Sequence, residues 1–257
     1  MSPVRRRGPG RIGVRAVQLG VPVALLAIWY LATTRWGVSR ILLPNPVAVA
    51  QALGHVLATG EFVADLRVTL TELAIAFAIS ATSGIAVGYL VSRTSFRIRA
   101  FEPLLAAIYS VPLILFLPIY VLWFGLGPPS KIALGATISF FPVVLATVAG
   151  FGNVDRMMVT AARSMGASDL QLFRFVLLPA AFPVIIAGAR LGFTVALLSI
   201  IGSETLASLA GLGHKIVELS EGMEMPRMFA YIAFVVAIAA ILNIAVSRLE
   251  AAWGRRP

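Results

Sequence analysis

Six long apolar stretches separated by short polar segments dominate the sequence. A helix needs about 20 apolar residues to cross the hydrocarbon core of a bilayer, and each stretch is long enough to do so. The pattern predicts an all-α membrane protein with six transmembrane helices, an even number that returns the C-terminus to the side of the N-terminus. The six stretches are residues 16–34, 66–91, 101–124, 132–152, 183–206 and 228–249.

The first stretch follows a strongly basic segment, as the apolar part of a secretory signal would. It is longer than a typical signal sequence, however, and no small-x-small cleavage site follows it. We therefore expect an uncleaved first helix. The basic residues before it are Arg5, Arg6, Arg7, Arg11 and Arg15.

The distribution of basic residues predicts the orientation. With the N-terminus inside, the cytoplasmic segments hold 14 of the 21 Lys and Arg residues, the outer segments hold six, and Arg190 lies within a span. Basic residues are enriched in cytoplasmic loops, so both termini are expected in the cytoplasm. This layout gives a basic N-terminal segment (1–15), a transmembrane domain (16–250) and a cytoplasmic tail (251–257).

Composition agrees with a membrane protein and excludes several other classes. Hydrophobic residues make up 59% of the chain and charged residues 12%, with a mean hydropathy of +0.93. The net charge of +10 is gathered between apolar runs rather than on an aromatic and basic surface, so no nucleic-acid partner is expected. There is no cysteine and there are two distant histidines, so no metal site is expected.

Small residues and prolines add detail to this plan. Ser80, Gly84 and Gly88 form a small-xxx-small stripe that permits close helix packing. Asn45-Pro46 is a helix start, and the apolar residues that follow predict a short amphipathic helix on the outer membrane face. Prolines within spans predict kinks, which suit a gated pore and a structural bundle equally. These prolines are Pro112, Pro118 and Pro142.

The longest predicted cytoplasmic loop, residues 153–182, has a helix–turn–helix pattern. Gly166 can end the first helix in a left-handed cap, and Ser168 with Gln171 forms a capping box for the second. Pro179 is expected to stop that second helix. Pattern alone leaves two interpretations equally open, an interfacial hairpin packed on the bundle and a contact for a partner. The expected apolar faces are Met158, Ala161, Ala162 and Met165, then Leu172, Phe173, Val176 and Leu177.

The loop resembles the cytoplasmic EAA loop of ABC-importer permeases. Residues 161–166 read Ala-Ala-Arg-Ser-Met-Gly, and after nine more residues 176–179 read Val-Leu-Leu-Pro; Thr160 replaces the usual Glu. In the family this loop is a coupling helix that docks on the ATPase subunit. The resemblance therefore implies that ATPase coupling involves Thr160, Ala161, Ala162, Met165, Gly166, Leu178 and Pro179.

Further motifs resemble the nitrate/sulfonate/taurine branch of the same family. The resemblance implies a type I (MetI-like) core of five helices, about residues 62–250, after one N-terminal helix. It also implies a multi-pass protein of the bacterial inner membrane and a homodimer. The implied partners are two cytoplasmic ATPase subunits that bind the ATP and Mg and an external solute-binding protein, and the implied solute is a small anion. The motifs are Leu43-Pro44-Asn45-Pro46, residues 122–127 with Ser130-Lys131-Ile132, Phe140-Phe141-Pro142 and Gly211-Leu212-Gly213.

Polar residues within spans are candidates for the translocation path. Arg190 and Glu204 are ionisable, and such groups in a span mark function by default. Snorkelling or binding of backbone carbonyls explains Arg190 equally simply, and most of the small hydroxyl residues suit helix–helix hydrogen bonds. The path candidates are Tyr109, Ser110, Ser139, Arg190, Ser199 and Glu204.

Two other classes of function compete with a permease subunit. An enzyme is disfavoured because the sequence has no Gly-x4-Gly-Lys-Ser/Thr phosphate loop and no catalytic acid/base pair. An ion-coupled secondary transporter would normally show inverted repeats and intramembrane carboxylates for ion coupling; no repeat is evident, and Glu204 by itself is a weak coupling site. The sequence therefore predicts a non-enzymatic permease of an ATP-driven importer, which carries a small anion or, alternatively, a vitamin precursor.

Overall fold

The computed structural model describes residues 11–253, with side chains from residue 20 to residue 251, and this part of the chain contains helices and no strand. The all-α prediction is confirmed. The helices are α1 Arg11–Thr34, α2 Pro46–Thr59, α3 Phe62–Ser92, α4 Ser95–Tyr109, α5 Leu117–Phe124, α6 Pro128–Gly152, α7 Arg156–Ser164, α8 Asp169–Leu172, α9 Leu178–Leu206, α10 Leu212–Glu221 and α11 Met225–Trp253; a 3-10 turn (Leu113–Phe116) precedes α5, and a π-helical turn (Phe173–Leu177) precedes α9.

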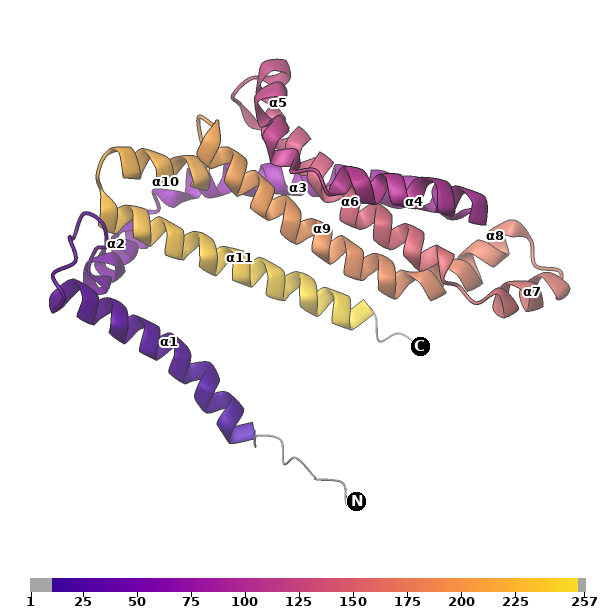
Figure 1. The fold of residues 1–257 in the computed structure, drawn as a ribbon, viewed down its shortest axis with the longest axis horizontal. Coiled ribbons are helices and arrows are strands. Elements are labelled where there is room, and N and C mark those ends of the chain that lie inside the picture. The colour runs from indigo at the N-terminus through magenta and orange to yellow at the C-terminus, as the bar shows by residue number, and fades with distance from the viewer. Residues whose placement is uncertain (1–10, 254–257) are drawn as a thin grey trace. The chain divides into compact units, whose positions relative to one another are not determined.

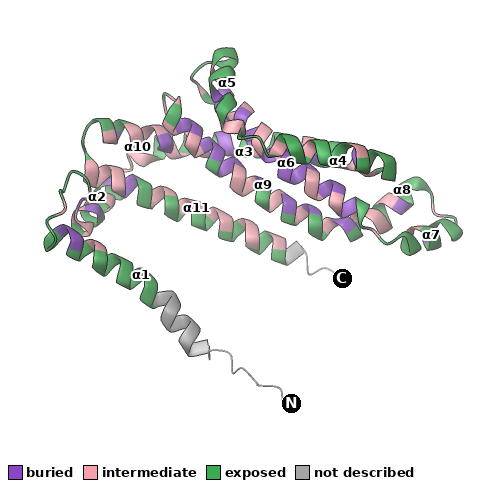
Figure 2. Ribbon diagram, in the orientation of Figure 1, coloured by how far each residue is buried: buried purple, intermediate pink, exposed green. Residues whose placement is uncertain are grey.

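The chain divides into two compact units. The first contains the described residues up to Glu61 together with Glu218–Ala233, and the second contains Phe62–Val217 with the rest of α11. In the second unit α6 packs against both α3 and α9, as Figure 1 shows. Figure 2 shows that the buried positions of this unit gather along these three helices.

Small residues let α3 and α9 approach α6 closely. Gly84 and Gly88 of the predicted stripe are buried on α3 and face α6, where a Cβ on Gly84 would meet the Val143 side chain. On α9, a Cβ on Gly192 would lie 3.1 Å from the carbonyl oxygen of Ser139. The helices therefore contact through backbone at these points, as is usual where lipid gives no hydrophobic drive for association.

Replacement of Gly88 by alanine is expected to destabilise this packing. The new Cβ would lie 2.5 Å from the Cβ of Thr147 and 3.0 Å from the carbonyl oxygen of Val144, so α3 and α6 would have to separate. Overpacking of this kind costs about 2 kcal/mol, measurable as a lower Tm of the detergent-purified protein. Gly202→Ala is the matched control, because a Cβ there meets nothing within 4 Å. Equal Tm values for the two variants would contradict close packing at Gly88.

Four helices are long and apolar enough to cross a membrane among the described residues. They are α3, α6, the continuous helix Asp169–Leu206 and α11, which correspond to four of the six predicted spans. The part of α1 whose side chains are described, Gly20–Thr34, is a shorter apolar helix.

The third predicted span, residues 101–124, is not one straight helix. Two helices, Ser95–Tyr109 and Leu113–Phe124, meet at an angle of 73°. Together they are long and apolar enough to form one broken span. The break falls at Ser110–Pro112, because proline lacks the N–H that would continue the helix and its ring disfavours a helical residue before it. The kink predicted from Pro112 is therefore confirmed and is larger than a simple bend.

The prediction that Pro179 ends a separate loop helix is wrong. Helical structure continues from Asp169 through Leu206, and the N–H of Leu178 bonds the Phe173 carbonyl in an i→i+5 pattern. Pro179 has no N–H to donate, and the π-helical turn directly before α9 accommodates it inside this continuous helix. A π-helical turn at a proline thus joins the loop directly to the fifth predicted span.

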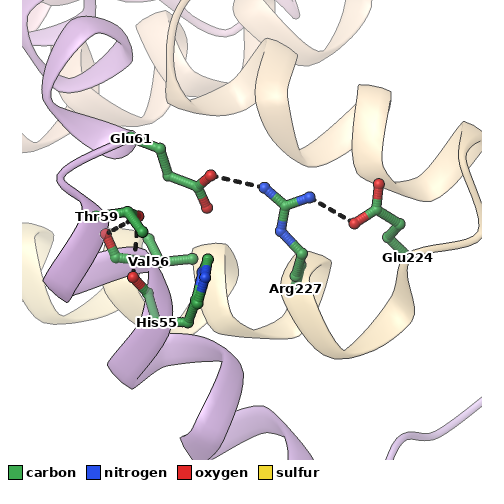
Figure 3. Close-up of polar contacts among 6 residues, drawn as sticks. All are labelled: His55, Val56, Thr59, Glu61, Glu224 and Arg227. Carbon is green, nitrogen blue, oxygen red and sulfur yellow. Dashed lines mark hydrogen bonds and ion pairs between the residues drawn. The ribbon is translucent and has the colours of Figure 1, made fainter.

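The first unit is tied together by polar contacts. Asn45 caps α2 by accepting a hydrogen bond from the Val47 N–H at 2.8 Å, as the sequence predicts, and the Trp29 indole donates to the Pro44 carbonyl at 3.0 Å. Arg227, in the first turn of α11, donates to Glu61 at 2.8 Å and to Glu224 at 2.6 Å (Figure 3). This pair of ion pairs fastens the segment after α2 to the start of α11.

Candidate functional site

The loop of residues 153–182 has the local geometry that its sequence predicts. The Asp155 side chain caps α7 by accepting from the Met157 N–H at 2.8 Å. Gly166 adopts φ +80°, the left-handed conformation expected at a helix C-terminus. Ser168 and Gln171 form the reciprocal capping box at the start of α8. The predicted Gly166 cap and the predicted Ser168–Gln171 capping box are confirmed, and the Asp155 cap is an additional feature that the structure shows.

Helix α7 has two opposite faces. Met158, Ala161 and Met165 are three and four residues apart, so they share one face, and it is exposed to solvent: Met165 is 83% exposed and Met158 51%. Arg156 and Thr160, also four apart, lie on the other face and line a cavity. An amphipathic connector packed on the bundle would bury its methionines, which this helix does not.

The residues expected to couple to the ATPase occupy two places. Five of them lie at α7 and its terminal turn, where Ala162 is buried and the others are exposed. Leu178 and Pro179 lie at the start of α9 instead, and Leu178 packs on a core cluster of Phe151, Ala181 and Ile185. The structure therefore divides the motif into a surface part and a part anchored in the bundle.

A second site lies at the other end of α3, α6 and α9 and is buried and polar. The Glu204 carboxylate accepts a hydrogen bond from the Thr69 hydroxyl at 2.7 Å and from the Gly213 N–H at 2.8 Å. Thr69 in turn accepts from the Leu212 N–H at 3.0 Å. Glu204 thus joins α9 to α3 and to the first turn of α10.

Two further charges complete this buried cluster. Lys131 on α6 is fully buried, donates to the carbonyl oxygens of Leu126 and Gly127, and interacts electrostatically with Glu72 and Glu204. Glu72 on α3 is 1% exposed, and its oxygens accept no hydrogen bond from any described residue. Two carboxylates therefore lie near one ammonium group in a buried site, and the hydrogen bonds of that ammonium group go to backbone carbonyls. We name Thr69, Glu72, Lys131 and Glu204 the polar cluster.

The polar cluster explains why residues 211–213 read Gly-Leu-Gly. Gly211 has φ +105°, and a Cβ there would lie 2.5 Å from Cδ of Glu204. At Gly213 a Cβ would lie 2.7 Å from the Glu204 Cβ and 2.5 Å from the Ile201 carbonyl oxygen. Backbone without side chains is needed to wrap the carboxylate. Two motifs that are 80 residues apart in sequence, at Lys131 and at Gly211, thus meet at one site.

The sequence predicted Glu204 as a path candidate and named Lys131 only as part of a family motif, and it did not single out Thr69 or Glu72. A usable signal was present, because Glu72 is an ionisable residue inside a predicted span. Asp65, Thr69 and Glu72 are also spaced four and three residues apart, which places them on one helix face. Asp65 accepts from the Gly211 N–H at 3.2 Å, so two residues of that face, Asp65 and Thr69, contact the same turn.

The six path candidates are not brought together. Arg190 forms an ion pair at 3.0 Å with Glu250 of α11, and the Tyr109 ring stacks on Phe141. Ser110 and Ser139 bond carbonyls of their own helices, and the Ser199 hydroxyl is buried with no partner among the described residues. Glu204 belongs to the polar cluster. The described chain therefore presents no continuous polar path made of these residues.

Known proteins resemble this chain in sequence over most of its length. The family model described as "binding-protein-dependent transport system inner membrane component" matches residues 61–256. The taurine transport system permease protein of Escherichia coli K12 is 30% identical over 91% of this chain and 87% of its own length. A putative aliphatic sulfonates transport permease protein of Bacillus subtilis 168 is 29% identical (95% and 89%), and the riboflavin transport system permease protein of Chloroflexus aurantiacus is 30% identical (96% and 95%).

Solved structures share the fold. A chain of the inward-facing MetNI methionine ABC transporter aligns with a TM-score of 0.67 at 19% identity, over 77% of this chain and 98% of that one. A chain of an amino acid ABC transporter with histidines aligns with a TM-score of 0.63 at 22% identity, over 80% and 98%. The arrangement of helices in the present chain is therefore that of type I importer permeases.

Proposed function

This chain belongs to the family of inner-membrane components of binding-protein-dependent transport systems, and we propose that it carries small sulfonates such as taurine across the membrane. It is a multi-pass permease subunit of an ABC importer and not an enzyme. In the proposed assembly it pairs with a second copy of itself. Two ATPase subunits, which bind the ATP and Mg, lie on the cytoplasmic side together with both of its termini.

The exposed face of α7 carries the coupling part of this proposal. Met157, Met158 and Met165 are large apolar side chains at 76%, 51% and 83% exposure in a segment between two spans. Methionine-rich surfaces adapt to partner surfaces, and exposed apolar patches of this kind mark interaction sites. Closure of the ATPase dimer would move α7, and the continuous helix from Asp169 to Leu206 would transmit that motion into the membrane.

The polar cluster supports a rigid response to that motion. It links α3, α6 and α9 at the ends of these helices opposite to the α7 loop, where burial strengthens each polar contact. We infer that the three helices reorient as one body when α7 is displaced, and so give alternating access.

Similarity to taurine and aliphatic sulfonate permeases is the observation that favours a sulfonate. The riboflavin permease is equally similar in sequence, so riboflavin is the second candidate. Proteoliposomes that contain this chain, its ATPase and its binding protein should take up labelled taurine only when ATP is supplied. Vanadate should abolish the uptake and an ionophore should not.

Competition separates the candidate solutes. An excess of an aliphatic sulfonate should block the taurine signal, and riboflavin should not. Riboflavin uptake that an excess of taurine does not reduce would reject the sulfonate proposal. Uptake driven by an ion gradient without the ATPase would contradict the ATP-driven mechanism itself.

A further inference from the structure

A cavity lies between the inner face of α7 and the ends of α3 and α6. Its volume is about 540 Å³, and it is lined by the α3–α4 turn (Ser92 to Ser95), the end of α6 and one face of α7. Arg156 spans it by donating to the Ser95 hydroxyl at 3.2 Å. The cavity is thus lined by residues from two stretches that are distant in sequence, 89–98 and 151–177, both within the second unit.

The charges that line this cavity are predominantly positive. Arg93, Arg156 and Arg163 face one carboxylate, Asp169. Arg163 forms an ion pair with Asp169 and donates a hydrogen bond to the Ala167 carbonyl. The Asp169 carboxylate also interacts electrostatically with Arg93. Arg93 and Arg156 form no ion pair with any described residue. The lining therefore carries two positive charges more than it carries negative ones.

The residue that distinguishes this loop from its family pattern lies in the same cavity. Thr160 lines it, at the position where the EAA pattern has Glu. A glutamate there would place a second carboxylate among the three arginines. The threonine instead offers a short hydroxyl group and leaves the positive charge uncompensated, so this chain has room and charge for an anion from outside.

We propose that this cavity is an oxyanion site that binds a phosphate, sulfate or sulfonate group through Arg93 and Arg156, with Arg163 and the Thr160 hydroxyl at its edge. Guanidinium groups present paired N–H donors that match the oxygens of such groups. The occupant is not a side chain of the docked ATPase, because Met158 and Met165 point to the opposite face of α7 from Arg156 and Thr160. The group can come from a free cytoplasmic anion or from a lipid headgroup.

The test measures equilibrium binding of labelled inorganic sulfate to the complete transporter in nanodiscs of phosphatidylcholine. Saturable binding is expected, with competition by inorganic phosphate. A second arm uses nanodiscs that contain phosphatidylglycerol and no free oxyanion. Phosphatidylglycerol that is retained on the protein in native mass spectra, and that blocks sulfate, would identify a lipid headgroup as the source.

Three variants make the site falsifiable. Thr160→Glu and Arg93→Gln should each weaken sulfate binding by about tenfold, because each removes one net positive charge from the cavity. Asp169→Asn should strengthen binding, a gain that misfolding cannot imitate. Arg99→Gln is the matched control on α4, since Arg99 does not line the cavity.

The proposal is overturned by an absence of saturable binding in both arms or by binding that Thr160→Glu leaves unchanged. Binding that arises only after the ATPase subunits are removed would assign the arginines to an ATPase carboxylate, and would overturn it too. The expectation that bound sulfate alters ATP hydrolysis depends in addition on the proposed coupling role of α7. Sulfate that binds without altering hydrolysis would support the site and count against that role.

Discussion

Replacement of Lys131 by methionine is expected to be among the most destabilising single substitutions in the chain. Lys131 is fully buried and is the cation of the polar cluster, where it faces the carboxylates of Glu72 and Glu204. Methionine fills similar space but leaves both carboxylates without a cation. Removal of one partner from a buried ionic cluster costs about 3–5 kcal/mol. The measurement is the Tm of the purified transporter, together with the amount of chain that reaches the membrane.

The same cluster predicts a rescue. Glu72→Gln alone should have a small effect, because the Glu72 oxygens accept no hydrogen bond from the described residues and the amide removes a charge at nearly constant volume. Combined with Lys131→Met, it should restore part of the lost stability, since Glu204 keeps its donors Thr69 and Gly213. A Lys131→Met variant as stable as the parent, or a Glu72→Gln variant equally damaging, would contradict this account of the cluster.

Local features of the fold could be predicted from the sequence because nearby residues determine them. The caps at Asn45 and Ser168 and the left-handed Gly166 depend on hydrogen bonds or backbone angles within a few residues, and all three are confirmed. Four of the six predicted spans likewise follow from apolar length alone. The family resemblance added what those patterns could not, the connection of the 153–182 loop to an importer.

Features that depend on distant residues could not be predicted in the same way. The partners of Glu204 come from α3 and from residues 211–213, and no pattern within one helix reveals that they meet. The sequence places Arg190 within one span and does not indicate its partner, whereas the structure pairs it with Glu250, which is 60 residues away. The rule that a proline ends a helix does not hold at Pro179, because a π-helical turn accommodates the proline inside a continuous helix.

The Gly166→Val substitution is expected to abolish ATP-driven uptake while the chain remains folded. Gly166 adopts φ +80°, and a Cβ there would meet no other atom within 4 Å, so the cost is one of backbone conformation and not of packing. A non-glycine residue in the left-handed region costs about 1–2 kcal/mol, and a β-branched one more. The α7–α8 turn would adopt a different conformation and displace Met165, whereas the core of α3, α6 and α9 lies away from it.

Asparagine is the matched control for this turn, because it tolerates the left-handed conformation better than other side chains do. Gly166→Asn should retain most uptake, and Gly166→Val should retain a normal Tm but lose the stimulation of ATP hydrolysis by the loaded binding protein. The ordering Gly, Asn, Ala, Val in coupled activity would follow from backbone strain alone. If valine supported full uptake, the geometry of this turn would have no part in coupling. If asparagine failed as completely as valine, the space around Gly166 would have to be filled by the ATPase, since it is empty in the isolated chain.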